Sequence, residues 1–180
     1  MSYLSTITYR IVPDNTLSII RNCSGCGCKR SYINTGNFRV NANGSLLDVW
    51  LIYQCPECKH TYNLPIYERI RPEKINKEEY QHFLENEEGT AFRYGLDKKI
   101  MMQQKSEIDW DKVTYHFEVV SDQESDRNCY IVQNPYQLKI RPERIAAQLM
   151  ELGRNQIKKL QQEGKIMICQ ADCENMKIIY

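Results

Sequence analysis

Cys23-Ser24-Gly25-Cys26 and Cys55-Pro56-Glu57-Cys58 are two C-x-x-C pairs separated by 28 residues. Glycine and proline favour tight turns, so each pair can present two thiolates on one side of a turn. If the intervening chain folds back as a hairpin, the pairs meet as a tetrahedral cage of four sulfurs, as in structural Zn²⁺ sites. The spacing therefore predicts one structural zinc ion, with Cys23, Cys26, Cys55 and Cys58 as its ligands.

Other occupants and ligand sets also fit this spacing. Iron binds two such pairs in rubredoxin-like sites. Cys28 can take the place of Cys26, and His60 that of Cys58. Reduced, buried cysteines explain the number of cysteines but not the doubled spacing. Four thiolates leave no open position for water, which favours a structural and not a catalytic site. The expected counter-charges are Lys29, Arg30 and Lys59.

The chain between the two pairs has the pattern of a β-hairpin. Residues 38–42 precede Asn43-Gly44, a strong two-residue turn signal because both residues tolerate positive φ. The return strand, residues 46–54, is apolar on both faces apart from Asp48, which predicts a central strand. A carboxylate in such a strand needs a partner, and Arg39 is the candidate.

The rest of the chain alternates between strand and helix patterns. Pro65 indicates that a third strand lies at an edge or a bulge. Arg71-Pro72-Glu73 and Arg141-Pro142-Glu143 both favour a helix start, since proline suits the first helical position. The predicted elements are a strand over 61–69, helices over 71–84 and 90–100, a strand over 113–119, a loop over 121–128, a strand over 129–132 and a helix pair that starts at residue 141 and includes residue 160.

Length and composition predict a globular α+β protein with three segments. The chain has 180 residues, of which 42% are hydrophobic and 26% charged. Residues 1–70 carry 7 basic and 4 acidic groups, residues 71–133 carry 9 and 14, and residues 134–180 carry 8 and 5. We expect a zinc-ribbon-like β domain over 1–70, an acidic helical segment over 71–112, and strands plus a basic helix pair over 113–180. Such a charge distribution suits a polyanionic partner at the ends, and is equally typical of solvated surface charge.

Two stretches of the hairpin resemble a bacterial family of unknown function: Phe38-Arg39-Val40-Asn41-Ala42-Asn43 and Leu47-Asp48-Val49-Trp50-Leu51-Ile52-Tyr53-Gln54-Cys55. Thr61-Tyr62-Asn63 and Glu68-Arg69 are similar to the Thr-Trp-Asn and Glu-Arg of that family. The resemblance extends over most of the chain and is most specific over residues 21–70. It implies a zinc-ribbon-like bacterial protein and no particular activity.

Residues 138–168 resemble the S-four-type RNA-binding module of ribosomal and RNA-modifying proteins. Arg141-Pro142-Glu143-Arg144 matches the start of its first helix, Gly153-Arg154-Asn155 the Ser-Arg that opens its second helix, and Gly164-Lys165-Ile166 the entry into its strand. Glu143 and Gly153 stand where the module has Asp and Ser, and its Val-Asn-Gly ending is missing. The resemblance implies binding of structured RNA, such as ribosomal or transfer RNA.

The residue pattern of this segment also predicts a basic helix pair. Ile145 and Leu149 share one helix face, while Arg154 and Lys158 lie together at i, i+4 on the next helix. Residues 134–168 contain seven basic and three acidic side chains. Such faces can follow a phosphate backbone, although solvated lysines are the plainer interpretation. The candidate RNA-binding residues are Arg141, Arg144, Arg154, Lys158 and Lys165.

The sequence lacks the motifs of common enzymes. It has no Gly-x-x-x-x-Gly-Lys loop, no His-Glu-x-x-His and no Gly-x-Ser-x-Gly, and its three histidines lie far apart. We therefore expect a protein without enzymatic activity. Two functions remain: binding of structured RNA through the helix pair, or a protein-interaction adaptor in which apolar and acidic surfaces meet another protein.

The remaining sequence features indicate a cytoplasmic protein. The longest apolar run, Val49-Trp50-Leu51-Ile52-Tyr53, is far shorter than the ~20 residues of a membrane span. The N-terminus lacks the pattern of a signal peptide. Thiols stay reduced in the cytosol, so Cys129, Cys169 and Cys173 are expected to be buried as small hydrophobic residues.

Overall fold

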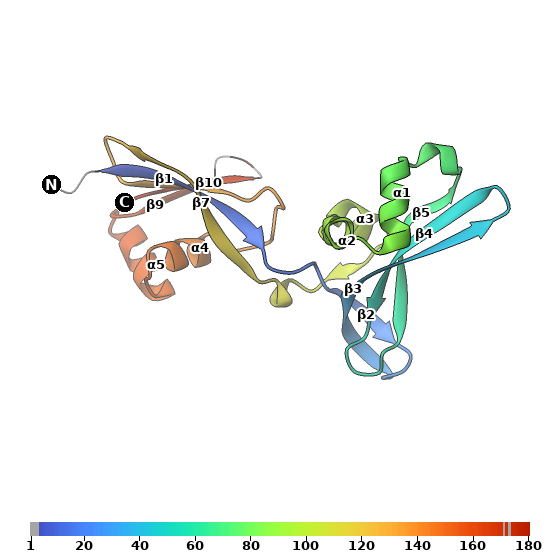
Figure 1. Ribbon diagram of the computed structural model, residues 1–180. Helices are drawn as coiled ribbons and strands as arrows, with labels where there is room; N and C mark the ends of the chain where they lie inside the picture. Colours follow the sequence, from blue (N-terminus) through green and yellow to red (C-terminus); the bar gives the residue numbers. More distant parts are fainter. Residues whose placement is uncertain (1–3, 171, 173) are drawn as a thin grey trace. The chain divides into compact units, whose positions relative to one another are not determined.

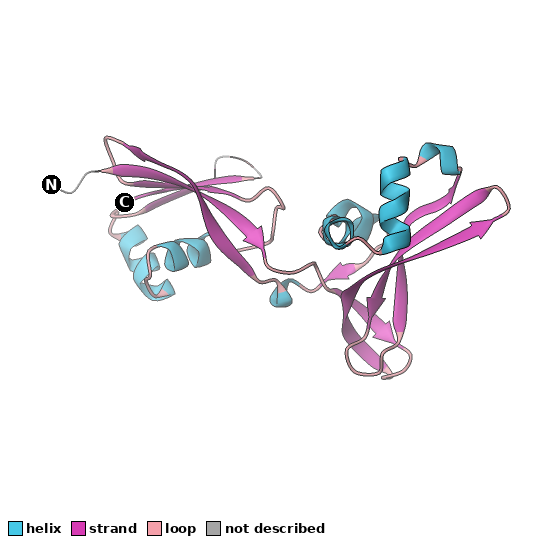
Figure 2. Cartoon of the chain, viewed as in Figure 1, coloured by secondary structure: helices cyan, strands magenta, loops and turns pink. Residues whose placement is uncertain are grey.

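The computed structural model describes residues 4–170, 172 and 174–180, and the chain divides into two compact units. One unit consists of residues 15–113. The other combines residues 1–14 with 114–180, so the chain leaves this unit and later returns to it (Figure 1). Each unit contains a five-stranded sheet and helices, which confirms the α+β class (Figure 2).

The unit of residues 15–113 is built on an antiparallel sheet with the strand order β5-β4-β3-β2-β6. The predicted hairpin is present, β4 lies between two strands, and β5, which contains Pro65, is an edge strand as predicted. The elements are β2 (Ile19–Cys23), β3 (Cys28–Asn43), β4 (Leu46–Gln54), β5 (Thr61–Ile70), the 3₁₀ helix η1 (Pro72–Lys74), α1 (Lys77–Glu85), α2 (Glu88–Gly95), α3 (Lys98–Gln103), β6 (Glu107–Ile108) and the 3₁₀ helix η2 (Trp110–Lys112).

The hairpin differs from the prediction at two points. Asn43 pairs with Leu46, so the loop is Gly44-Ser45, and Gly44 has the positive φ of 63°. The carboxylate of Asp48 has a backbone partner in place of Arg39: its Oδ1 accepts a hydrogen bond of 2.8 Å from the amide of Arg69. This bond holds Arg69 at φ 51°, where the pairing of β4 with β5 is irregular. A bulge on the partner strand thus provides the donor, which the residue pattern did not show.

The predicted helix boundaries of this unit shift because capping side chains decide them. Pro72 begins only the short η1, and α1 starts at Lys77, where the Asn76 side chain accepts hydrogen bonds from two backbone amides. The helix predicted over 90–100 is two helices. Asp97 caps α3, which separates it from α2.

The core of this unit lies between the sheet and the first two helices. Val49 and Leu51 on β4 are fully buried. Their neighbours include an aromatic cluster in which the ring centroids of Phe38 and Phe83 are 4.8 Å apart and those of Phe83 and Tyr94 are 5.7 Å apart. Since these rings come from β3, α1 and α2, the cluster attaches both helices to the sheet.

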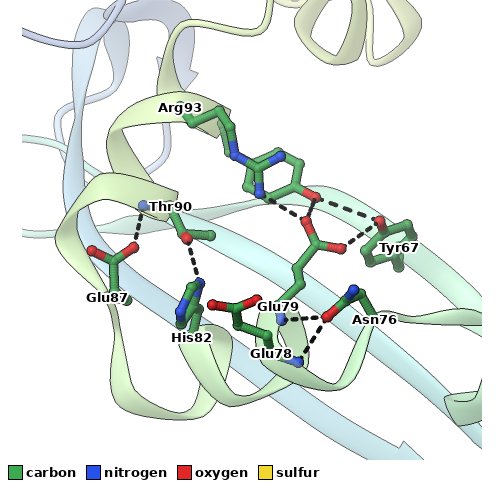
Figure 3. A network of polar contacts seen from close by, with 9 residues as sticks. Tyr67, Asn76, Glu78, Glu79, His82, Glu87, Thr90 and Arg93 are labelled. Atoms are coloured by element: carbon green, nitrogen blue, oxygen red, sulfur yellow. Dashed lines mark hydrogen bonds and ion pairs between the residues drawn. The ribbon is translucent and has the colours of Figure 1, made fainter.

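A polar network closes the edge of this aromatic cluster (Figure 3). The Glu79 carboxylate on α1 accepts hydrogen bonds from the Tyr94 hydroxyl (2.7 Å), the Tyr67 hydroxyl (3.1 Å) and Nη2 of Arg93 (2.8 Å). Partial burial favours a raised pKa of Glu79, but the donors outweigh it and the pKa is lowered. One carboxylate therefore joins α1, α2 and β5.

We expect Glu79→Gln to lower the free energy of unfolding by about 1–3 kcal/mol at pH 7, because hydrogen bonds to a charged acceptor are replaced by weaker ones. The folded state lowers the pKa of Glu79, so its contribution is complete above the ordinary value of about 4.3 and is lost as the pH falls below it. Chemical denaturation at pH 7 and near pH 3.5 measures the difference between variant and wild type.

The matched control for this experiment is Glu78→Gln, which changes the neighbouring exposed carboxylate of the same helix turn. Comparison of variants at each pH removes other acid-sensitive contributions that all of them share. If wild type exceeded Glu79→Gln in free energy of unfolding by the same amount at both pH values, the ionised Glu79 carboxylate would not be the source of the stabilisation.

The second unit is built on a sheet with the order β7-β1-β8-β10-β9, in which β1 and β8 are parallel and the other neighbours antiparallel. Its helices lie on one side of the sheet (Figure 1). The elements are β1 (Ser5–Pro13), β7 (Tyr115–Glu124), β8 (Cys129–Gln133), α4 (Pro142–Leu149), α5 (Arg154–Gln162), β9 (Met167–Gln170) and β10 (Asn175–Ile179).

This unit differs from the predicted segment boundaries at residues 70 and 112. The first strand, β1, pairs with β7 and β8, with the fully buried Ile11 opposite Phe117. Residues 5–13 therefore belong with the C-terminal segment and not with the cysteine-bearing sheet. The physical reason is that strand pairing joins residues more than a hundred positions apart, which no local pattern encodes.

Other predictions for this unit are confirmed or corrected in detail. β8 and α4 occur where they were expected, and β7 continues to Glu124, into the predicted loop. Cys129 is buried, but Cys169 is exposed on β9, so the prediction of burial was wrong for that residue. Cys173 lies outside the described residues. Within the described ranges, no helix is long and apolar enough to cross a membrane.

Candidate metal centre and basic helix pair

Each C-x-x-C pair occupies the turn between two strands, the first between β2 and β3 and the second between β4 and β5. The two turns have the same hydrogen bond. The amide of Gly27 donates to the carbonyl of Cys23 (2.8 Å), and the amide of Lys59 donates to the carbonyl of Cys55 (3.1 Å). Both donor residues have positive φ, 68° and 64°. The two pairs are therefore presented by equivalent turns, although only the first has a glycine at this position.

The turns bring four cysteine sulfurs together. The Sγ atoms of the set all lie within 4.8 Å of one another, with Cys23 and Cys58 at 3.2 Å and Cys26 and Cys55 at 3.8 Å. Thiolates around one zinc ion, each at about 2.3 Å from it, lie about 3.8 Å apart at tetrahedral corners. The cluster thus has the size of a metal site and can hold a metal ion.

The structure brings together the four cysteines of the expected set and not the alternative ligands. Cys28 is exposed and lies outside the cluster. The ring of His60 is turned to Ser24, with Nε2 3.1 Å from the hydroxyl oxygen. Among the expected counter-charges, Arg30 interacts with the sulfur of Cys26, whereas Lys29 pairs with Glu107 at 3.2 Å. The amine of Lys59 donates to the carbonyl of Pro56.

Two groups that support the cluster were not expected from the sequence. Tyr32 on β3 is buried, and its hydroxyl interacts with the sulfur of Cys23; together with the Cys58 thiol it lowers the pKa of Cys23 to about 6. The pKa values of Cys26 and Cys58 are raised instead, with hydrogen bonds to the neighbouring thiols among the causes, so the four thiols of the cluster interact strongly with one another. Gly25 lies against Cys58, where an added Cβ would be 2.7 Å from Sγ. Tyr32 gave no signal because its contact depends on strand register, whereas Gly25 was noticed only as a turn former.

We expect Gly25→Ala to weaken metal binding by about 10–100-fold, as changes next to metal ligands commonly do. The methyl group would displace the sulfur of Cys58 from the cluster. Competition with a chromophoric zinc chelator measures the affinity. Gly153→Ala is the control, because there an added Cβ meets only the flexible end of Gln156 at 3.3 Å. Equal zinc affinity in Gly25→Ala and wild type would contradict the close approach of Gly25 to the sulfur of Cys58.

The basic helix pair presents its cations to solvent. The expected RNA-binding residues are all exposed, with Arg141 at the N-cap of α4 and Arg154 as the first residue of α5. Lys165 is 2.7 Å from the carboxylate of Glu163, which compensates its charge. The buried side of the pair contains Ile145 and Ile157. The predicted division of these helices into an apolar and a basic face is therefore present.

Tyr115, at the start of β7, lies beside α4. The guanidinium carbon of Arg144 lies 5.7 Å from the centre of the Tyr115 ring. Burial raises the pKa of Tyr115, and the charges of Arg144 and Arg154 act in the opposite direction. The Tyr115 hydroxyl donates to Oε1 of Gln148 on α4. Two side chains of α4, Arg144 and Gln148, therefore lie beside this aromatic ring.

Residues 40–172 match the family described as "Protein of unknown function (DUF1062)". The match covers well over half of the chain, and the chain belongs to this family. It includes Cys55 and Cys58, while Cys23 and Cys26 precede it. No curated protein and no solved structure matches the chain. The resemblance to a family of unknown function is confirmed, and that to the RNA-binding module stays a prediction.

Proposed function

We propose that this protein is a non-enzymatic, zinc-stabilised RNA-binding protein. In this proposal, Cys23, Cys26, Cys55 and Cys58 bind one structural Zn²⁺. The four sulfurs fill a tetrahedral shell, so the ion closes the two turns and takes no part in chemistry. The distances between the four sulfurs support a metal ion as the occupant, and a closed shell of four thiolates suits structural zinc.

The observation that carries the RNA proposal is the guanidinium of Arg144 at 5.7 Å from the centre of the Tyr115 ring, in a helix pair whose basic side chains are exposed. Single-stranded bases in loops and ends of structured RNA stack on aromatic rings and on guanidinium planes, while arginines also bind phosphate. Arg141 and Lys158 extend the positive charge along the same two helices. The order helix, helix, strand of α4, α5 and β9 agrees with the order expected from the RNA-binding module.

A second candidate is the protein-interaction adaptor, which one observation favours. Val119 and Val120 are consecutive residues of β7 with exposed fractions of 62% and 44%. β7 is an edge strand of its sheet, and exposed apolar side chains on an edge suit the pairing of another chain. In this case the basic face would be incidental to function.

The test is the double variant Arg154→Glu, Lys158→Glu, with a structured transfer RNA as the probe. We expect RNA affinity to fall strongly, and each lost phosphate contact to reduce the slope of log affinity against log salt by roughly 0.7–0.9. Thermal stability should change little, because both side chains are exposed. Fluorescence anisotropy over a series of salt concentrations measures the RNA affinity and its dependence on salt.

Lys165→Gln is the matched control, since the carboxylate of Glu163 already compensates Lys165. It should reduce RNA affinity far less than the double variant. A salt-insensitive affinity that is equal in wild type and double variant would refute the RNA proposal. The adaptor would then be the better account, and purified protein would show no excess absorbance at 260 nm from bound nucleic acid.

A further inference from the structure

A pocket of about 440 Å³ lies beside the edge strand β5, in the unit of residues 15–113. Its lining includes the apolar residues Leu46, Ile66 and Ile70. The charged residues of the lining are Arg69, Arg71, Lys74 and one acidic residue, Glu68. The pocket belongs neither to the cysteine cluster nor to the basic helix pair, so its charge calls for a separate explanation.

Within the residues that the structure describes, the three cations of this pocket, Arg69, Arg71 and Lys74, take part in no ion pair. Glu68 is the acidic residue in the same lining. Like charges that share a pocket repel one another, and an anion bound between them would remove this repulsion. Excess positive charge in a pocket that also has apolar lining residues is therefore a property of an anion-binding site.

The backbone holds these cations in place before any ligand binds. The carboxylate of Asp48 accepts a hydrogen bond from the amide of Arg69 and fixes that residue at φ 51°. Arg71 and Lys74 are three residues apart and joined by a backbone hydrogen bond of 2.9 Å across η1, which places them on one side of the 3₁₀ turn.

Tyr67 lines the pocket and also attaches β5 to the rest of the unit. The hydroxyl of Tyr67 donates to Glu79, which fastens β5 to α1 at this point (Figure 3). On the other side, Ile75 is buried directly after η1 and anchors the turn. The backbone that carries the cations is therefore anchored on both sides, which lowers the entropic cost of ordering this segment around an anion.

We propose that this pocket binds the phosphate or diphosphate group of a small molecule. Two arginines offer planar donor groups that match phosphate oxygens, and Lys74 adds a third positive charge. A group with at least two negative charges compensates the charged lining, whose formal charge is +2 with Glu68 included. A volume of about 440 Å³ is in the range of small-molecule sites. This proposal is independent of the RNA proposal, which concerns the other unit.

Amide chemical shifts of the isotope-labelled, zinc-loaded full chain, titrated with inorganic pyrophosphate, test this inference. We expect saturable shifts that cluster over residues 66–74. Arg71→Gln and Lys74→Gln should each weaken binding by about tenfold, since each removes a charge-assisted hydrogen bond. Lys77→Gln, which changes an exposed lysine of α1 outside the pocket, is the matched control and should leave the affinity unchanged.

Three results would overturn the inference. One is the absence of saturable shifts at the pocket, and another is an equal loss of affinity in Lys77→Gln. The third is a pocket that responds to an RNA oligonucleotide but not to pyrophosphate, which would make it a backbone contact. Arg154→Gln should leave pyrophosphate binding intact, so that failure of the RNA proposal and failure of this one remain distinguishable.

Discussion

Four cysteine sulfurs within 4.8 Å of one another impose the constraint on which the cysteine-bearing unit depends. Four thiolates at such distances repel one another strongly unless a cation lies between them. The sulfurs come from two turns that are 28 residues apart in sequence, at one end of the sheet and away from α1 and α2 (Figure 1). Zinc bound there would hold the β2–β3 turn to the β4–β5 turn. In small zinc domains such binding contributes about 10–16 kcal/mol, which is folding energy.

The opposite part of the same unit is held by conventional packing. The rings of Phe38, Phe83 and Tyr94 attach α1 and α2 to the sheet, and the Glu79 carboxylate joins these helices to β5. The long strands β3 and β4 extend from the cysteine turns to this core. A metal ion bound by the cysteines would therefore stabilise one end of the sheet, while the aromatic cluster stabilises the other, so that neither end would depend on burying a large apolar area by itself.

The sequence predicted those features that depend on local spacing. Two C-x-x-C pairs indicated the cysteine cluster, and the pattern around Gly44 indicated the β3–β4 hairpin. Features that depend on distant pairing were missed: β1 joins β7 and β8, and Asp48 takes the amide of Arg69 as its partner and not Arg39. The sequence also missed Tyr32 beside Cys23, because the register of β3 brings it there. Side-chain caps at Asn76 and Asp97 moved helix ends that the apolar periodicity alone placed elsewhere.

The account as a whole rests on a zinc ion bound by four cysteine thiolates. X-ray absorption at the zinc edge, on protein purified without added metal, tests this claim most directly. The account predicts one zinc per chain, with a shell of four sulfur atoms at about 2.3 Å and no nitrogen or oxygen ligand. A shell with nitrogen or oxygen ligands, an iron edge in its place, or folded protein that contains no stoichiometric metal would contradict it.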